Sequence, residues 1–160
     1  MTIHIVRHAR AGQHFGPGEP DDLRPLTEKG LQQADALVDQ LVGLGVTRVL
    51  SSPYLRCLQT VRPLSECLGL SIEEHTGLLE SADIEETWAL IEQLAQNQTD
   101  AVVCTHGNLI GPIIDRLHRR GVMLEPSERD CKKGSIWTLK SDPEGNFTSA
   151  VYTPPALFSD

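Results

Sequence analysis

The sequence predicts a three-layer α/β fold in which helices cover both faces of a mostly parallel central sheet. Segments with strand and helix patterns alternate along roughly the first 120 residues, an order that is typical of parallel sheets. Two apolar runs at 135–140 and 147–153 then flank the turn-forming segment Asp-Pro-Glu-Gly-Asn, which predicts an antiparallel pair at one edge of the sheet. The length of 160 residues fits one domain, 1–160, with a single core.

Each predicted strand is a short apolar run that stops at a charged or polar residue. A β-branched run predicts the first strand at residues 2–7. Further strands are expected at 46–50 and 101–105, with a short extended piece at 70–73. Between the first strand and the first helix, residues 9–26 hold six glycines and prolines, which predicts a long loop.

Four helices are predicted from apolar residues that recur every three or four positions. Thr27 is a suitable N-cap for the first helix, which reaches about Val42. Ser52 is expected to cap the second helix, with Pro53 at its first helical position and Gly69 just past its end. The later helices are expected at about 84–95 and from Gly107 or Asn108 to about Arg120.

The composition excludes several classes of partner. The chain has 14 basic and 22 acidic residues and a formal net charge of -8, which disfavours a nucleic acid polymer. No apolar stretch approaches the length of a membrane span, and charge interrupts the apolar run at the N-terminus, unlike in a signal peptide. We expect a cytoplasmic protein that does not associate with membranes, and the sequence leaves its oligomeric state open.

Four residues that suit phosphate chemistry follow the predicted strands. Arg7 and His8 end the first strand, Arg56 lies in the first turn of the helix after the second, and His106 directly follows residues 101–105. In an open α/β sheet, ligands bind outside the carboxyl ends of the strands, so these side chains are expected at one site.

The residue types suggest a role for each group. The two guanidinium groups suit the equatorial oxygens of a phosphoryl group in transfer. His8 is the expected nucleophile, kept neutral because the nearby arginines lower its pKa. His106 is expected to donate a hydrogen bond to a phosphoryl oxygen.

Three motifs in this order resemble those of the histidine phosphatase superfamily, which includes the cofactor-dependent phosphoglycerate mutases. They read VRHARAG, SSPYLRCLQT and VCTHGN, and the run LRPLTEKGLQQA is similar to that of the small SixA-like phosphohistidine phosphatases. The resemblance implies a phosphoglycerate mutase-like fold and a phosphate pocket made of Arg7, His8, Arg56 and His106, with His8 phosphorylated. Ala9 departs from the family, which usually has glycine there, and we take the alanine as tolerated.

The resemblance also implies a carboxylate that protonates the leaving oxygen and later activates water. The segment GLLESADIEE places Glu80 where this acid is expected, while Asp83, Glu85 and Glu86 compete for the role. For Glu85 and Glu86, an exposed acidic helix start is the preferred interpretation.

Other polar residues are candidates for substrate binding. Arg10, Gln13 and His14 follow the nucleophile and either line the entrance or belong to a solvated loop. Asn108 either contacts the pocket or caps its helix.

We expect a metal-independent phosphatase without a cofactor. Only 49 residues lead from Arg56 to Thr105, too few for the long lid of the larger mutases, which favours hydrolysis at an open site. The expected partner is a phosphorylated small molecule, such as a phosphomonoester, or a phosphohistidine protein. The alternatives are a nucleotide or sugar phosphate phosphatase, a catalytically weak module that binds phosphate or phosphoprotein, and a metallohydrolase with His8, His106 and Glu80 as ligands.

Overall fold

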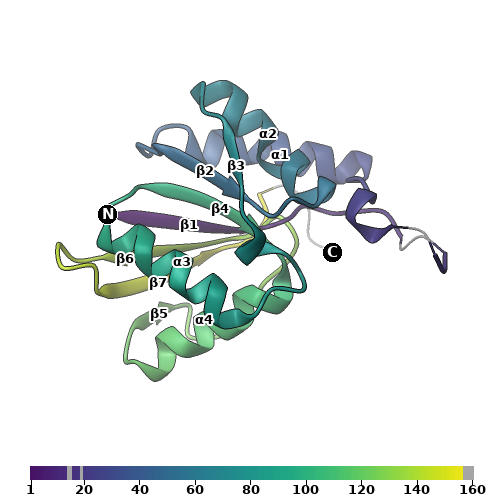
Figure 1. Ribbon diagram of the computed structural model, residues 1–160. Coiled ribbons are helices and arrows are strands. Elements are labelled where there is room, and N and C mark those ends of the chain that lie inside the picture. The colour runs from purple at the N-terminus through teal and green to yellow at the C-terminus, as the bar shows by residue number, and fades with distance from the viewer. Residues whose placement is uncertain (14–15, 19, 157–160) are drawn as a thin grey trace.

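A computed structural model describes residues 1–13, 16–18 and 20–156 as a sheet with helices on both faces (Figure 1). The strands are β1 (Thr2–Arg7), β2 (Arg48–Ser51), β3 (Ile72–Glu74), β4 (Ala101–Thr105), β5 (Met123–Glu125), β6 (Ile136–Ser141) and β7 (Phe147–Thr153). The helices are α1 (Glu28–Leu41), α2 (Leu55–Leu68), α3 (Ile84–Gln96) and α4 (Gly107–Arg119), with short 3-10 turns η1 (Asp21–Leu23) and η2 (Thr76–Leu78). In these ranges, no helix is both long and apolar enough to cross a membrane.

The sheet confirms the predicted fold class. Its strand order is β3-β2-β4-β1-β6-β7-β5, and β6 pairs antiparallel with both β1 and β7 while the other pairs are parallel. The C-terminal strands thus form the predicted antiparallel pair, and the short strand β5 extends the sheet beyond it. The sequence analysis did not foresee β5, because three residues with an exposed Met123 carry no apolar pattern.

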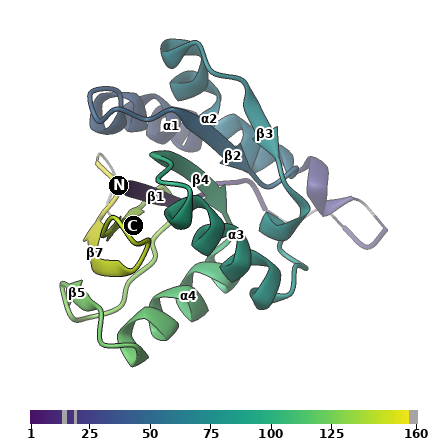
Figure 2. The same cartoon turned by 60° about the vertical axis from the view of Figure 1, so that its left-hand side comes forward.

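Alternate residues of the central strands pack against different helix pairs. Ile5 and Val103 belong to the core cluster under α3 and α4, whereas Val6 and Val102 belong to the cluster under α1 and α2. This alternation follows from the two-residue period of a strand. Figure 2 shows the two helix pairs on opposite sides of the sheet, so both faces of β1 and β4 are buried and their ends are held firmly.

The first two helices begin differently from one another. Thr27 caps α1 as predicted, because its Oγ1 accepts the backbone N–H of Gly30 at 3.1 Å. The prediction that Ser52 caps the second helix is wrong, since α2 begins at Leu55 with Tyr54 as N-cap. Ser52 instead directly follows β2, and its backbone N–H donates to the Cys104 carbonyl at 3.0 Å.

We expect Gly30→Ala to destabilise the fold. An added Cβ at this buried position would overlap the backbone carbonyl oxygen of Arg10, and overpacking against backbone costs about 1–3 kcal/mol. Gly111→Ala is the matched control, because this helical glycine has open space around it and alanine should stabilise α4 by about 0.5–1 kcal/mol. Urea denaturation measures both changes, and equal stability of the two variants would contradict the close approach of α1 to the loop.

Candidate active site

The carboxyl ends of β1 and β4 bring two histidines together. The strands pair in parallel with Arg7 opposite Thr105, and the backbone N–H of His8 donates to the Thr105 carbonyl at 3.1 Å. His8 and His106 therefore leave the sheet at the same level. Both are buried, and their ring centroids lie 5.5 Å apart in an edge-to-face arrangement.

A hydrogen bond fixes the tautomer of His8. Its Nδ1 lies 2.8 Å from the carbonyl oxygen of Ala9, and because a carbonyl only accepts, Nδ1 carries the proton. The Ala9 backbone N–H donates in turn to Thr60 Oγ1 at 2.9 Å, which holds the accepting peptide group in place. In the neutral ring, Nε2 keeps its lone pair, as an attacking nitrogen must.

Burial and positive charge keep His8 neutral. Desolvation is the largest cause and, together with the charges of Arg56, Arg7 and Lys133, lowers the pKa of His8 from 6.5 to about 4, against the opposing effect of the hydrogen bond to Ala9. At neutral pH the ring is therefore unprotonated.

His106 is also neutral and lacks one hydrogen-bond partner. Burial is the largest cause that lowers the pKa of His106 to about 3, followed by the repulsion that a protonated His8 would exert and by the charge of Arg56. Nε2 of His106 lies 2.9 Å from Ser52 Oγ. Its Nδ1 is buried and has no partner among the described residues.

Three buried nitrogens in this region have no hydrogen-bond partner among the described residues. Among the described residues, the buried side-chain nitrogens without a hydrogen-bond partner are Arg7 Nε, Arg56 Nε and His106 Nδ1. Each unsatisfied buried polar group costs about 1–3 kcal/mol, so their concentration in one place calls for a ligand rich in acceptor oxygens. A phosphoryl group supplies such oxygens.

The guanidinium group of Arg7 needs the glycine of the third motif. A Cβ at Gly107 would lie 2.9 Å from both Cζ and Nε of Arg7, so any larger residue would displace the side chain. Nη1 of Arg7 donates to the carbonyl of Cys131. The residue that follows His106 therefore has to be glycine if Arg7 is to keep its position.

Arg56 is almost fully buried and is held by two carboxylates. Its Nη2 lies 2.9 Å from Glu80 Oε2 and 3.1 Å from Asp21 Oδ2, and Nη1 donates to the Asp21 carbonyl at 3.0 Å. Although partial burial acts in the opposite direction, the hydrogen bond from Arg24 and the charge of Arg56 lower the pKa of Asp21. The sequence analysis missed Asp21, because it lies in a loop whose path no local pattern sets.

Of the four competing carboxylates, Glu80 is the one that lines the cavity. Its side chain is 45% exposed and pairs with Arg56, while the side chain of Asn108 donates to the Glu80 carbonyl at 2.7 Å. Asn108 therefore contacts the segment of Glu80 and does not cap α4, whose N-cap is His106. Asn108 is not among the residues that line the cavity.

The three other carboxylates serve α3 instead. Asp83 caps the helix, since its Oδ1 accepts the backbone N–H of Glu85 at 2.8 Å. Glu85 pairs with Arg116 at 2.6 Å, and Glu86 is exposed in the first turn. The preferred interpretation of Glu85 and Glu86 as an acidic helix start agrees with these positions.

A cavity of about 380 Å³ opens over His8. Arg10 and Gln13 from the loop contribute to its wall, whereas His14 lies outside the described residues. Arg24 and Lys133 also line it, and the sequence analysis missed both. The lining residues are Arg7, His8, Arg10, Ala11, Gly12, Gln13, Arg24, Arg56, Glu80 and Lys133.

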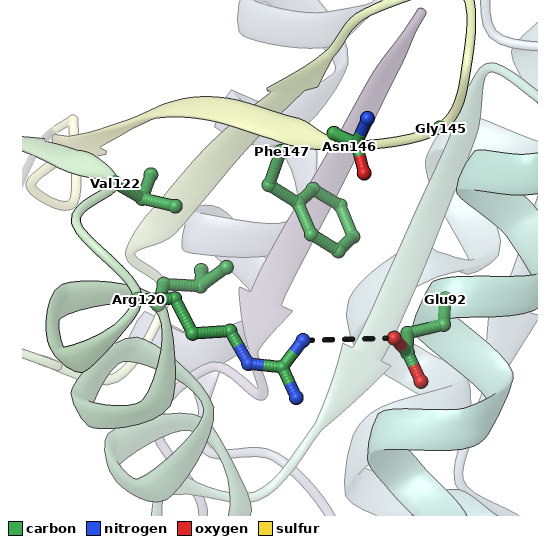
Figure 3. A pocket seen from close by; sticks show the side chains of 7 residues that line it. Glu92, Arg120, Val122, Gly145, Asn146 and Phe147 are labelled. Carbon is green, nitrogen blue, oxygen red and sulfur yellow. Dashed lines mark ion pairs between the residues drawn. The ribbon is translucent and has the colours of Figure 1, made fainter.

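A second cavity, of about 250 Å³, lies near the other end of the sheet (Figure 3). Its walls include the turn between β6 and β7, which sits beside the start of β1 rather than its end. Arg120 and Glu92 point toward one another there, 3.8 Å apart. None of the described residues that line this second cavity is a histidine or a cysteine, so the cavity over His8 is the candidate active site.

The methyl group of Ala9, the departure from the family pattern, packs away from the cavity. Ala9 is fully buried and forms a small apolar cluster with Leu26 and Ala34. It does not line the cavity.

Comparison with known proteins agrees with this geometry. A model of the histidine phosphatase superfamily (branch 1) matches residues 3–87. The phosphohistidine phosphatase SixA of Escherichia coli is 30% identical over 122 residues, which cover 73% of this chain and 74% of that protein. A solved structure of the protein histidine phosphatase SixA complexed with tungstate is 28% identical, with a TM-score of 0.75 and coverage of 92% of this chain and 93% of the other.

A longer relative is similar along almost the whole chain. The 8-oxo-(d)GTP phosphatase of Mycolicibacterium smegmatis is 32% identical over 157 residues, which cover 96% of this chain and 48% of that protein. The chain therefore spans about half the length of this relative.

These findings define the class of the protein. The chain belongs to the histidine phosphatase superfamily. Within it, similarity in both sequence and structure supports the SixA-like group.

We expect the free energy of unfolding to fall as the pH drops from about 6.5 to about 4. The pKa values of His8 and His106 are lower in the folded protein than the ordinary 6.5, so in this range the unfolded chain binds protons that the folded protein does not. Each histidine then contributes a loss of up to about 1.4 kcal/mol per pH unit, and the full stability is present above about 6.5. Urea denaturation at about pH 7, 6 and 5 measures the slope.

His106→Asn removes one of the two groups and should make this slope shallower. The same slope in variant and wild type would show that burial of His106 does not lower its pKa.

Proposed function

We propose that this protein is a metal-independent phosphatase that works through a phosphohistidine intermediate on His8. The observation that carries the proposal is the hydrogen bond from Nδ1 of His8 to the Ala9 carbonyl, which leaves an unprotonated Nε2 in a buried, cationic site. Nε2 attacks phosphorus, the bond to the leaving group breaks, and water then releases phosphate from His8. The substrate is a phosphomonoester or a protein phosphohistidine.

In this mechanism Arg7 and Arg56 hold the equatorial oxygens of the phosphoryl group. The Nε atoms of both arginines and the Nδ1 atom of His106 have no hydrogen-bond partner among the described residues. This supports the assignment, because each of these atoms would gain an acceptor when a phosphoryl group binds. For His106 the donor is an Nδ1–H, which requires that Ser52 Oγ donate to Nε2. Such donors stabilise the charge that develops in the transition state.

Glu80 is the proposed general acid. It lines the cavity and is anchored by Arg56 and by its own backbone bond to Asn108. When a phosphoryl group binds to the guanidinium group of Arg56, it replaces Glu80 as the partner of Arg56. The Glu80 carboxyl can then turn toward the leaving oxygen. Arg10, Gln13 and Asn108 are proposed to contact the remainder of the substrate.

We expect wild-type protein to hydrolyse p-nitrophenyl phosphate and a phosphohistidine-bearing protein in EDTA. His8→Ala should lower the rate by at least about 10³-fold, because the nucleophile is lost. His118→Ala, a change at an exposed histidine outside the cavity, is the matched control and should retain full activity. Released phosphate is measured for each protein and substrate.

Other outcomes of this experiment support other functions. Loss of wild-type activity in EDTA would indicate a metallohydrolase, although no three His, Cys, Asp or Glu residues in the described ranges are grouped to hold a metal ion. No phosphate release, together with protection against thermal unfolding by inorganic phosphate, would indicate a module that only binds phosphate.

The Glu80→Gln variant should separate substrates by their leaving groups. An alkyl phosphate needs a proton on its leaving oxygen, so we expect kcat to fall by about 10²-fold or more. For p-nitrophenyl phosphate, whose leaving group is a stable anion, the loss should be much smaller. Glu86→Gln is the control, and equal losses on both substrates would show that Glu80 is not the acid.

A further inference from the structure

Ser52, in the second motif, is fully buried beside His106. Its Oγ lies 2.9 Å from Nε2 of the histidine. Ser52 directly follows β2, and its backbone N–H donates at 3.0 Å to the carbonyl of Cys104, two residues before His106. The hydroxyl of Ser51 donates to the Ser52 carbonyl at 2.9 Å. Both backbone groups of Ser52 are thus engaged, and its hydroxyl has a fixed position relative to His106.

The Nε2 side of the His106 ring is closed to substrate. Besides Ser52 Oγ, the sulfur of Cys57 lies near this nitrogen, at 3.7 Å. Ser52 and Cys57 are both 0% exposed. The other ring nitrogen, Nδ1, has no hydrogen-bond partner among the described residues. Nδ1 is therefore the nitrogen of His106 that remains for a phosphoryl oxygen.

His106 can donate from Nδ1 only if its Nε2 carries no proton. The pKa of His106 is lowered to about 3, chiefly by burial, so the ring is neutral at neutral pH. A neutral imidazole has a proton on one of its two nitrogens and a lone pair on the other. Some group has to hold the ring in the tautomer with the proton on Nδ1.

The hydroxyl hydrogen of Ser52 selects this tautomer. Ser52 Oγ accepts the backbone N–H of Tyr54 at 3.3 Å, and an amide N–H only donates. Among the described residues, His106 Nε2 is the acceptor left for the hydroxyl hydrogen. If Nε2 carried the ring proton, that buried hydrogen would have no acceptor, which is unfavourable. The favoured arrangement has Ser52 donating to Nε2 and the ring proton on Nδ1.

Tyr54 holds the His106 ring in the orientation that this hydrogen bond needs. The two rings pack edge to face, with centroids 5.1 Å apart and an interplanar angle of 79°. Cζ of Arg56 lies 4.8 Å from the centre of the same tyrosine ring. Tyr54 is the N-cap of α2, the helix that carries Arg56. The segment from Ser52 to Arg56 therefore positions a histidine and an arginine of the site together.

We propose that Ser52 is a positioning residue that fixes the proton of His106 on Nδ1 and so prepares this histidine to donate to the phosphoryl group. The inference rests on the proposed function and adds to it a residue that does not touch the substrate. Without the hydroxyl, the sulfur of Cys57, a weak acceptor, is left beside Nε2. The proton can then move to Nε2, and Nδ1 presents a lone pair that repels the phosphoryl oxygens.

The tautomer is measured by 15N NMR of the imidazole nitrogens, and Ser52→Ala removes the hydroxyl with little change of shape. In wild type at about pH 7, His106 should have a proton on Nδ1 and none on Nε2. In Ser52→Ala, a proton should be present on Nε2 in a substantial fraction of the molecules. The signals of His106 are those that His106→Asn lacks. Cys57→Ala is the matched control at the same nitrogen and should keep the wild-type tautomer, because the Ser52 hydroxyl is still present.

Kinetics on p-nitrophenyl phosphate measure the consequence for the reaction. Ser52→Ala should lower kcat by about 10-fold or more, because the transition state loses a donor. KM should change by less than about threefold, since both arginines still hold the phosphoryl group. Ser65→Ala is the matched control and should leave both parameters unchanged. It removes another buried hydroxyl of α2, one that donates to the Arg62 carbonyl at 3.2 Å and contacts neither histidine.

Two outcomes would overturn the inference: a proton on Nε2 of His106 in wild type, or a wild-type tautomer in Ser52→Ala. In the second case any loss of kcat would come from altered structure, which thermal unfolding of the variant reports. The wild-type spectrum needs no variant, so it tests the inference even if Ser52→Ala does not fold. If wild type releases no phosphate, the proposed function fails, but the NMR measurement still decides whether Ser52 sets the tautomer.

Discussion

The parallel pairing of β1 with β4 is the constraint on which the site depends. One backbone hydrogen bond, from His8 to the Thr105 carbonyl, sets the level at which both histidines leave the sheet. A slip of one residue would turn the side chains of β1 to the opposite face of the sheet. That slip is prevented by the core, because Ile5 and Val6 are each fully buried against a different helix pair.

The buried cations of the site have to be held before substrate arrives. Arg56 is 1% exposed, and leaving such a charge unpaired would cost several kcal/mol. Asp21 and Glu80 provide the counter-charges from the rim, where they remain partly solvated. Burial and the neighbouring positive charge keep both histidines neutral, while the two carboxylates balance the charge of Arg56.

The sequence allowed the fold class and the four central residues to be predicted, because both depend on local patterns. Arg7, His8 and His106 follow apolar strands directly, and a parallel sheet collects the ends of its strands at one edge. Asp21 and Lys133 escaped prediction because the path of a loop brings Asp21 to Arg56 and a turn brings Lys133 to the cavity. Gln33 of α1 escaped as well. It is buried, and its Nε2 donates to the Lys133 carbonyl at 3.2 Å. A polar residue on a helix is expected to be exposed, and here only the packing of the turn at Gly134 buries it. The prediction for Ser52 was wrong because it used only the local preference of serine for N-cap positions. The hydrogen bond of Ser52 to the Cys104 carbonyl and its contact with His106 involve residues that are distant in the sequence.

The sign of the charge differs between the protein as a whole and the cavity over His8. The protein as a whole has a formal net charge of -8, so an extended acidic surface would be repelled wherever it left the cavity. Among the described residues that line the cavity the sign is reversed, with five cationic side chains and one acidic side chain, that of Glu80. Low-dielectric walls focus such a field on a ligand that enters the cavity. A ligand inside the cavity therefore meets a positive local field, although the net charge of the protein is negative. The local sign of the charge, rather than the net charge, determines which ligands the cavity attracts.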